Sequence, residues 1–424
     1  MINFRVMLLL LTAIAMSYTV VNGQTVRVVT MSGEAVAGQQ LEFTEDSANL
    51  SLQSGELKAL PISEIAKIEW LKTDAAEIPG TTLSLELVDD TKLLAQQVTV
   101  EDSVATVQLI TGLTATIPTR NIRWIRFKTI PQGSDLETAW SEIMESTEAG
   151  DLLIVRREVD EVLTLSGVEG VLGTLSETSL AFKFDDNEVE VERERLDTLR
   201  YYHPAGRKLP EVQAKLVDRF GQILYLRDWR VDSETFVAKT LSNVELPNRV
   251  ADIVELDLEV GRVLHFADVE PSTFEWTPFV GGTLEANHLQ NLFAMTRNST
   301  FSGKPLSLYS ATGFGSGTTE TRTFTRGMAL RSQSRLVYRV PEGFKRLIGW
   351  AGIDPTVRPR GNVSLLIEGD GQALFSSTVD GESSEPVKID LEIEGVRRLS
   401  IQILFGEAGD LGDRLHLIEL RAVK

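Results

Sequence analysis

The sequence offers few side chains in the arrangements that catalysis requires. Its four histidines lie at positions 203, 265, 288 and 416, and none is paired four residues apart as in an HExxH zinc site. No G-x-S-x-G segment is present that could raise a nucleophilic serine on a strand-to-helix turn. Gly303 and Lys304 are followed by Pro305, not by the serine or threonine of a phosphate-binding loop. We therefore expect a protein that is not an enzyme and has no catalytic residues.

Two groups of acidic residues could in principle hold a cation. The glutamates at every second position from Glu188 to Glu194 share one strand face, which indicates either a cation-binding stripe or a solvated face that discourages edge pairing. Asp410 and Asp413 lie in a glycine-rich segment and could give oxygen ligands to calcium. Fewer than six ligands are visible there, so we predict no metal site and no cofactor.

The N-terminus has the pattern of an export signal. Arg5 precedes an apolar run from Val6 to Met16, and residues 21–23 offer a cleavage site before Gln24. This order is typical of a cleaved signal peptide, whereas the alternative is a buried N-terminal helix. We expect residues 1–23 to be removed and the mature protein to be secreted or periplasmic. No later segment is apolar enough to span a bilayer, so we expect no membrane insertion.

The composition restricts the partners. Without Arg5 the 42 basic residues become 41 against 61 acidic ones, a net charge of −20. Such a surface repels nucleic acid and anionic membrane, which we exclude as partners. The absence of cysteine excludes disulfides, a thiol nucleophile and a cysteine-linked lipid anchor. Stability must come from packed cores, and the length predicts several domains.

A recurring unit fills residues 24 to about 260. Each copy has an alternating apolar run that ends in a turn, two further runs, a Leu-Pro or Ile-Pro step and then spaced apolar residues. Pro61 and Pro118 lie 57 positions apart, Pro247 marks the fourth copy, and Val189 with Val191 replaces the step in the third. The period of two predicts half-buried antiparallel strands.

Four or five short strands in about 50 residues suit a small, strongly bent barrel. The copies resemble Sm-like or SH3-like small β-barrels in pattern. We expect them at residues 24–74, 79–130, 150–203 and 208–260.

One helix is predicted between the second and third copies, near residues 135–147 within a linker at 134–148. Ser134 and Glu137 form a capping box. An apolar stripe follows at helical spacing, made of Leu136, Ala139, Trp140, Ile143 and Met144. We interpret this stripe as a packing face against a barrel, with a partner-binding surface as the alternative.

The pattern changes from Arg262 onward, where loops lengthen and glycine and serine increase. Eight strands are predicted, at residues 306–309, 335–340, 346–353, 362–368, 372–379, 387–393, 398–405 and 414–423. This spacing indicates a β-sandwich of jelly-roll type over residues 262–424. The fold class is therefore all-β, with tandem small barrels followed by a sandwich.

Six segments of the C-terminal part are distinctive, at residues 326–332, 335–340, 344–354, 361–371, 395–400 and 406–413. In their order and spacing they resemble the NPCBM family of carbohydrate-binding modules found on exported bacterial proteins. The resemblance implies a galactose-binding-like jelly roll that holds a glycan. Two departures stand out, because relatives usually carry histidine where Arg331 lies and tryptophan in the last strand where Leu417 and Ile418 lie.

A sugar site needs aromatic faces and planar polar side chains. We predict carbohydrate-binding residues from this set: Trp276, Tyr309, Arg331 and Asp354. Phe314 and Trp350 are further aromatic candidates, although the apolar strand around Trp350 favours a core position for it.

Two hypotheses for function follow. The first is an exported, non-catalytic carbohydrate-binding protein whose C-terminal sandwich holds a glycan or polysaccharide, with the barrels as spacer or docking modules. The alternative is a structural or protein-interaction component of the cell envelope, or of an extracellular assembly, with no sugar binding. The departures from the family pattern at Arg331 and at Leu417 and Ile418 favour the alternative. The resemblance of the whole domain to the family favours the carbohydrate-binding hypothesis.

Overall fold

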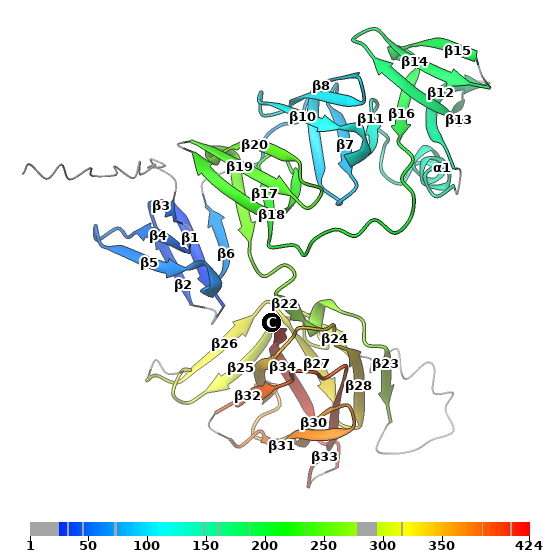
Figure 1. Cartoon of the computed structure of the whole chain (residues 1–424). Helices are drawn as coiled ribbons and strands as arrows, with labels where there is room; N and C mark the ends of the chain where they lie inside the picture. The colour runs from blue at the N-terminus through cyan, green and yellow to red at the C-terminus, as the bar shows by residue number, and fades with distance from the viewer. Residues whose placement is uncertain are drawn as a thin grey trace, which may run out of the picture. The chain divides into compact units, whose positions relative to one another are not determined.

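The computed structural model (Figure 1) describes residues 25–31, 34–44, 46–71, 74–146, 149–159, 162–185, 187–232, 234–277, 295–314, 317–383, 385–407 and 409–424. The predicted signal peptide lies outside these residues. The chain divides into two compact units, residues 1–261 and 262–424. Among the described residues, no helix has the length and apolar character needed to cross a membrane.

The N-terminal unit contains four consecutive groups of strands, one for each sequence repeat. The first has β1 (Val26–Thr30), β2 (Ala35–Gly38), β3 (Gln40–Phe43), β4 (Ser47–Ser51), β5 (Leu57–Pro61) and β6 (Ile65–Trp70). The second has β7 (Leu83–Leu87), β8 (Lys92–Glu101), β9 (Val104–Leu109), β10 (Thr114–Pro118) and β11 (Ile122–Arg126). The third has β12 (Asp151–Val159), β13 (Val162–Leu175), β14 (Ser179–Phe184), β15 (Asn187–Glu192) and β16 (Leu196–Arg200). The fourth has β17 (Ala214–Asp218), β18 (Ile223–Asp232), β19 (Thr235–Thr240), β20 (Glu245–Arg249) and β21 (Ile253–Asp257).

Each group repeats one connection. A short 3₁₀ turn lies directly before the last strand in all four, at Ile62–Glu64, Thr119–Asn121, Arg193–Arg195 and Val250–Asp252. In all four groups the last strand pairs with the first, which pairs with the second. The all-β prediction is confirmed, and the barrel form of the repeats stays a prediction.

The last strands also join the repeats to one another. Strand β6 pairs with β21, with Ile68 opposite Leu256, and β11 pairs with β16, with Ile125 opposite Leu199. All four of these side chains are fully buried and belong to one continuous core. Edge strands expose unpaired N–H and C=O groups, and this edge-to-edge pairing satisfies them. The repeats thus form one unit in which the first is paired with the fourth and the second with the third.

The helix α1 (Asp135–Met144) begins as the sequence predicts and ends before the predicted boundary. The Ser134 hydroxyl accepts the Glu137 N–H at 3.3 Å, and the Glu137 carboxylate accepts the N–H of Gly133. Trp140 packs edge-on against Trp124 at 5.7 Å, and its Nε1 donates to the Thr198 hydroxyl at 3.0 Å. Trp140 of the apolar stripe therefore packs within the N-terminal unit, as the first interpretation expects, and the other stripe residues are only partly buried.

The C-terminal unit is a sandwich of two antiparallel sheets. One has the order β24 (Thr296–Arg297), β27 (Gly327–Arg331), β34 (Arg414–Val423), β29 (Arg346–Ile353) and β32 (Val387–Glu392), and β22 (Val263–His265) also pairs with β34. The other has the order β23 (Thr273–Trp276), β28 (Ser334–Arg339), β33 (Arg398–Phe405), β30 (Asn362–Gly369) and β31 (Gln372–Asp380). Their inner faces share one apolar core, which contains Leu336, Ile401 and Leu417. The predicted sandwich is confirmed, and every predicted strand is present.

A hairpin covers the outer face of the first sheet. It consists of β25 (Leu306–Ser310) and β26 (Glu320–Phe324). Leu308 of the hairpin and Ala329 and Ile418 of the sheet are buried together in a second, smaller core. Trp350 packs at the edge of this core, with its ring 6.0 Å from that of Phe314. Strand residues alternate between the two faces, so β34 sends Leu417 to the sandwich core and Ile418 to the hairpin.

Candidate ligand-binding site

One end of the sandwich has a polar depression of about 460 Å³. It is formed by the end of β27, by the loop after β29 and by the loop that leads into β34. We call it the arginine depression and define it by its lining residues: Arg331, Thr356, Val357, Arg358, Pro359, Arg360, Asp410, Leu411, Gly412, Asp413 and Arg414.

The two loops of the arginine depression are held directly against each other. Gly361 has φ +92°, and a Cβ at this position would collide with the carbonyl oxygen of Gly412. Only glycine accepts both this conformation and this approach at low cost. The N–H of Asn362 donates to Oδ1 of Asp413 at 3.0 Å. Asp413 is buried, which raises the pKa of its carboxyl group, while the Asn362 bond opposes this rise. The floor of the depression is therefore a fixed junction of backbone and carboxylate.

Arg331 extends from the end of β27 into the arginine depression. Its guanidinium carbon lies 4.7 Å from the centre of the Phe301 ring. Partial burial lowers the pKa of Arg331, the nearby charge of Arg414 lowers it further, and Asp410 opposes both effects. The side chain is thus held on an aromatic face beside a second cation.

Tyr309 lies behind the opposite wall and supports a different arginine. The guanidinium carbon of Arg358 lies 4.0 Å from the Tyr309 ring centre, and its Nη1 donates to the Ser383 carbonyl at 2.9 Å. The predicted aromatic residue therefore positions Arg358, which lines the depression. Arg358 was not predicted from the sequence, although two cations in the three residues 358–360 of a turn-rich segment were a usable signal.

Asp354 is buried behind the lining and holds the first loop in place. Its Oδ1 accepts the N–H of Thr356 at 2.9 Å and the Thr356 hydroxyl at 2.8 Å. Its Oδ2 lies 4.0 Å from Nη1 of Arg414. With only 4% of the residue exposed, Asp354 is placed to orient the loop and Arg414 and does not line the depression.

Trp276 ends the edge strand β23 at this same end of the sandwich. It lies opposite Ser334, and the next residue, Thr277, donates its N–H to the Gln333 carbonyl at 3.1 Å in the turn that follows Arg331. Trp276 is half-buried and is not among the lining residues. Phe314 and Trp350 lie apart from the site, in the core under the hairpin.

The calcium hypothesis gains no support from the geometry. Asp413 uses one oxygen for the Asn362 N–H, and Asp410 is exposed at the rim. In the part of the chain that the structure describes, no three His, Asp or Glu side chains are grouped closely enough to hold a metal ion. The glutamates at 188, 190 and 192 lie on β15 and Glu194 lies in the 3₁₀ turn that follows, and all four are exposed, as a solvated face would be.

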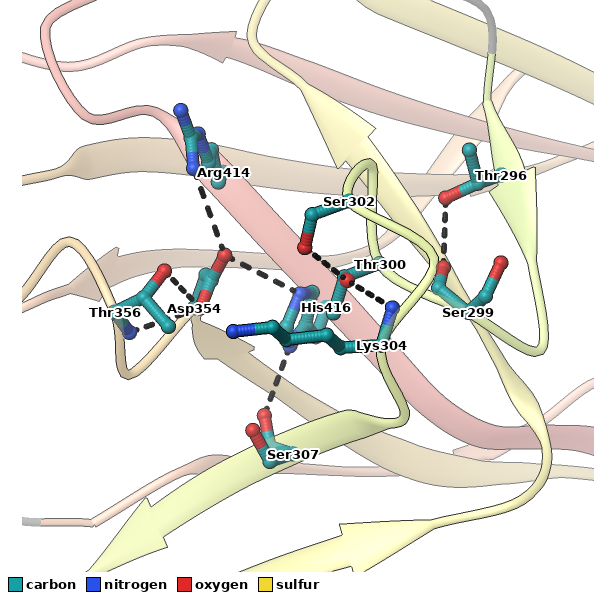
Figure 2. A network of polar contacts seen from close by, with 10 residues as sticks. All are labelled: Thr296, Ser299, Thr300, Ser302, Lys304, Ser307, Asp354, Thr356, Arg414 and His416. Atoms are coloured by element: carbon teal, nitrogen blue, oxygen red, sulfur yellow. Dashed lines mark hydrogen bonds and ion pairs between the residues drawn. The ribbon is translucent and has the colours of Figure 1, made fainter.

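His416 connects Asp354 to the hairpin (Figure 2). It is fully buried on β34, and its Nδ1 lies 2.8 Å from the Ser307 carbonyl of β25, so this nitrogen carries a proton and donates. Its Nε2 lies 3.9 Å from Oδ2 of Asp354. Burial lowers the pKa of His416, the nearby Arg414 adds to this, and the Ser307 bond and Asp354 oppose it. The neutral ring is therefore the folded form at neutral pH.

This burial predicts an acid-sensitive C-terminal unit. Below the ordinary histidine pKa of 6.5 the unfolded chain binds a proton more readily than the folded one, so acidification lowers the free energy of unfolding. We expect the stability advantage of the wild type over His416→Asn, which keeps a donor for Ser307 and does not titrate, to shrink between about pH 7.5 and 5.5. Urea unfolding at both pH values measures it. A pH-independent difference between the two proteins would contradict the assignment.

Comparison with known proteins identifies the family of the domain that contains this site. Residues 283–422 match the family model of the NPCBM/NEW2 domain, which confirms the predicted resemblance. A comparison with curated proteins finds no match for this chain.

Solved structures resemble the chain only distantly. CBM51 from Clostridium perfringens GH95 in complex with methyl-galactose has 13% identity and a TM-score of 0.31, with 38% of this chain and 99% of that chain covered. The CBM51-2 and INT domains of Clostridium perfringens ZmpB, with GlcNAc, have 11% identity and a TM-score of 0.32, with 50% of this chain and 40% of that chain covered. The M60 catalytic domain of ZmpB with CBM51-1 and CBM51-2 has 12% identity and a TM-score of 0.32, with 97% of this chain and 46% of that chain covered. The chain thus spans less than half the length of the two ZmpB structures, and scores this low assign no function.

Proposed function

We propose that the NPCBM/NEW2 domain at residues 283–422 binds a glycan, and that the arginine depression is where the glycan is held. The observation that carries this proposal is the coincidence of the family match with an open polar depression. Its lining residues all lie within the matched segment. Three of the four predicted sugar-binding residues line it or support its wall.

The chemistry of the depression suits a polyhydroxylated ligand. Guanidinium groups donate several hydrogen bonds in a fixed plane, which matches neighbouring sugar hydroxyls. Thr356 also lines the depression, and its hydroxyl donates to Asp354 at 2.8 Å. The rings of Tyr309 and Phe301 are covered by arginines, so they stabilise the donors and do not stack on the sugar themselves. Recognition would rest on hydrogen bonding more than on aromatic stacking.

The proposal extends to the whole chain as an exported, non-catalytic binding protein. The charge, apolar run and cleavage pattern of residues 1–23 support export. The lack of a catalytic motif supports a binding role. The N-terminal repeats are joined through β6 with β21 and β11 with β16, which supports a stiff spacer or docking unit. The proposed partner is a glycan or polysaccharide, and the proposed docking partners of the repeats are envelope proteins.

The glycan hypothesis predicts a specific effect at Arg331. Replacing it by alanine should weaken glycan binding about 10- to 100-fold, because one or more hydrogen bonds from a charged donor are lost. A glycan array identifies the ligand, and affinity electrophoresis of the full chain then measures the change. Arg335→Ala is the matched control, because Arg335 lies on β28 and pairs with the exposed Glu275 at 3.3 Å. Absence of binding to any glycan, with a specific protein recovered by pull-down, would favour the structural alternative.

A further inference from the structure

The arginine depression has a charge opposite to that of the chain around it. Its lining holds four arginines and two aspartates, whereas the whole protein carries a net charge of −19. Asp354 adds one carboxylate behind the wall, with its Oδ2 4.0 Å from Arg414. The arginines remain in excess even when these three carboxylates are all ionised. A local surplus of positive charge in a concave site concentrates anionic ligands there.

Two of the four guanidinium groups are fixed before a ligand arrives. Arg331 rests on the Phe301 ring at 4.7 Å, and Arg358 rests on the Tyr309 ring at 4.0 Å. Arg358 is further held by its bond to the Ser383 carbonyl at 2.9 Å. Stacking on an aromatic face holds the planar fork at a set angle, so less side-chain entropy is lost on binding.

The arginines also repel one another. Arg414 lies close enough to Arg331 to add to the lowering of its pKa by burial, so the two like charges are not fully offset by their acidic neighbours. Arg331 and Arg414 lie directly opposite each other in the pairing of β27 with β34. An anion bound between the two arginines would remove this repulsion. A neutral sugar would desolvate the same charges without opposing them.

We propose that the arginine depression selects acidic glycans, in which a sugar carboxylate or sulfate is bound by Arg331 and Arg414. This inference rests on the proposed glycan binding and adds the charge of the ligand to it. Carboxylate and sulfate share the chemistry that the site would bind, because both present paired anionic oxygens to the planar guanidinium group of arginine.

Matched pairs of acidic and neutral polymers test whether the ligand carries negative charge. Affinity electrophoresis of the full chain would compare polygalacturonate with its methyl ester, and dextran sulfate with dextran. We expect at least one acidic polymer to bind about tenfold or more tightly than its neutral counterpart, since bonds to charged groups carry the binding. Added salt should weaken this binding. The two polymer pairs distinguish a carboxylate ligand from a sulfate ligand.

Variants test the place of binding. Arg331→Gln and Arg414→Gln should each remove most of the preference for the acidic polymer. Arg397→Gln is the control, because Arg397 lines a separate depression and is highly exposed, with its Nη2 3.5 Å from Glu342. Thermal unfolding shows whether each variant keeps its fold. If one site variant unfolds, the other variant and the salt series on the wild type decide the result.

The outcomes separate the two proposals. Equal binding to the acidic and neutral polymers would overturn the acidic-glycan inference and leave glycan binding intact. An equal loss in Arg397→Gln would overturn the assignment to the arginine depression. Failure to bind any polysaccharide, including those of the array, would overturn both proposals.

Discussion

Replacing Leu417 by alanine should lower the free energy of unfolding of the C-terminal unit by about 2–5 kcal/mol, because the change leaves a cavity in a close-packed core. Leu417 lies on β34, the strand that pairs with both β27 and β29, opposite Met328 on one side and Ala351 on the other. It is fully buried and belongs to the core between the two sheets.

Urea unfolding followed by tryptophan fluorescence measures this loss, since Trp276 and Trp350 report on the C-terminal unit. Leu404→Ala is the matched control, because Leu404 lies on β33 with 37% of its surface exposed. We expect the control to change the free energy of unfolding by about 0.5 kcal/mol or less. Equal losses in the two variants would show that Leu417 does not occupy a tightly packed position.

The burial of Leu417 and Ile418 also changes the meaning of their departure from the family pattern. Leu417 faces the sandwich core, and Ile418 faces the smaller core under the hairpin. Neither side chain can touch a ligand in this chain, so these two residues do not argue against a glycan site. Arg331 differs, because it lines the arginine depression, and there the departure from the family pattern changes the chemistry of the site.

Replacing Asp197 by alanine should destabilise the N-terminal unit by about 3–5 kcal/mol, because it leaves a largely buried arginine without its partner. The Asp197 side chain is fully buried, and its Oδ2 lies 2.7 Å from Nη2 of Arg156, whose side chain is 15% exposed. Nε of Arg156 donates to the same oxygen at 2.9 Å, and the Thr198 hydroxyl donates to Oδ1 at 3.0 Å. The Asp197 carbonyl also accepts the N–H of Phe127 at 2.8 Å, next to the pairing of β11 with β16.

Two comparisons separate charge from packing at Asp197. Glu192→Ala removes an exposed pair with Arg195, in which both side chains are more than two-thirds exposed, and should cost less than about 1 kcal/mol. The double variant Asp197→Leu with Arg156→Met should recover most of the stability lost in Asp197→Ala, because no unpaired charge remains. A double variant as unstable as the single one would attribute the loss to packing. Urea unfolding, with Trp124 and Trp140 as local reporters, provides the measurement.

The strands of the sandwich follow directly from the sequence pattern. Along β29 and β33, apolar side chains alternate over the length of the strand, and β34 alternates on either side of a break at Leu417 and Ile418. The predicted bounds of all three strands agree with the structure. Alternation is sufficient here because one face of each strand must meet the core. The prediction missed β27, whose five residues are nearly all buried and show no alternation, and it missed strands that are shorter or more polar. β24 has two residues, and β26 is mostly exposed, so neither shows a usable period.

The candidate site was predictable only in part. Arg331 and Tyr309 were chosen for residue type, and the structure places one in the depression and the other behind its wall. Asp354 was chosen as a sugar ligand, yet it is buried and bonded to Thr356, because the turn after β29 needs an acceptor for its own donors. The role of Trp276 as a ligand contact stays a prediction.

The sequence by itself determined the all-β class, the strand pattern of the sandwich, the capped helix and the resemblance of the C-terminal part to its family. These depend on local periodicity, capping and motif order, which each segment carries independently of the others. Tertiary structure alone decided that Arg331, Arg358 and Arg414 would share one depression. They meet because β34 pairs with both β27 and β29 while loops from the two sheets lie against each other at Gly361 and Gly412. Such pairing depends on the burial of all the strands together, and no local pattern encodes it.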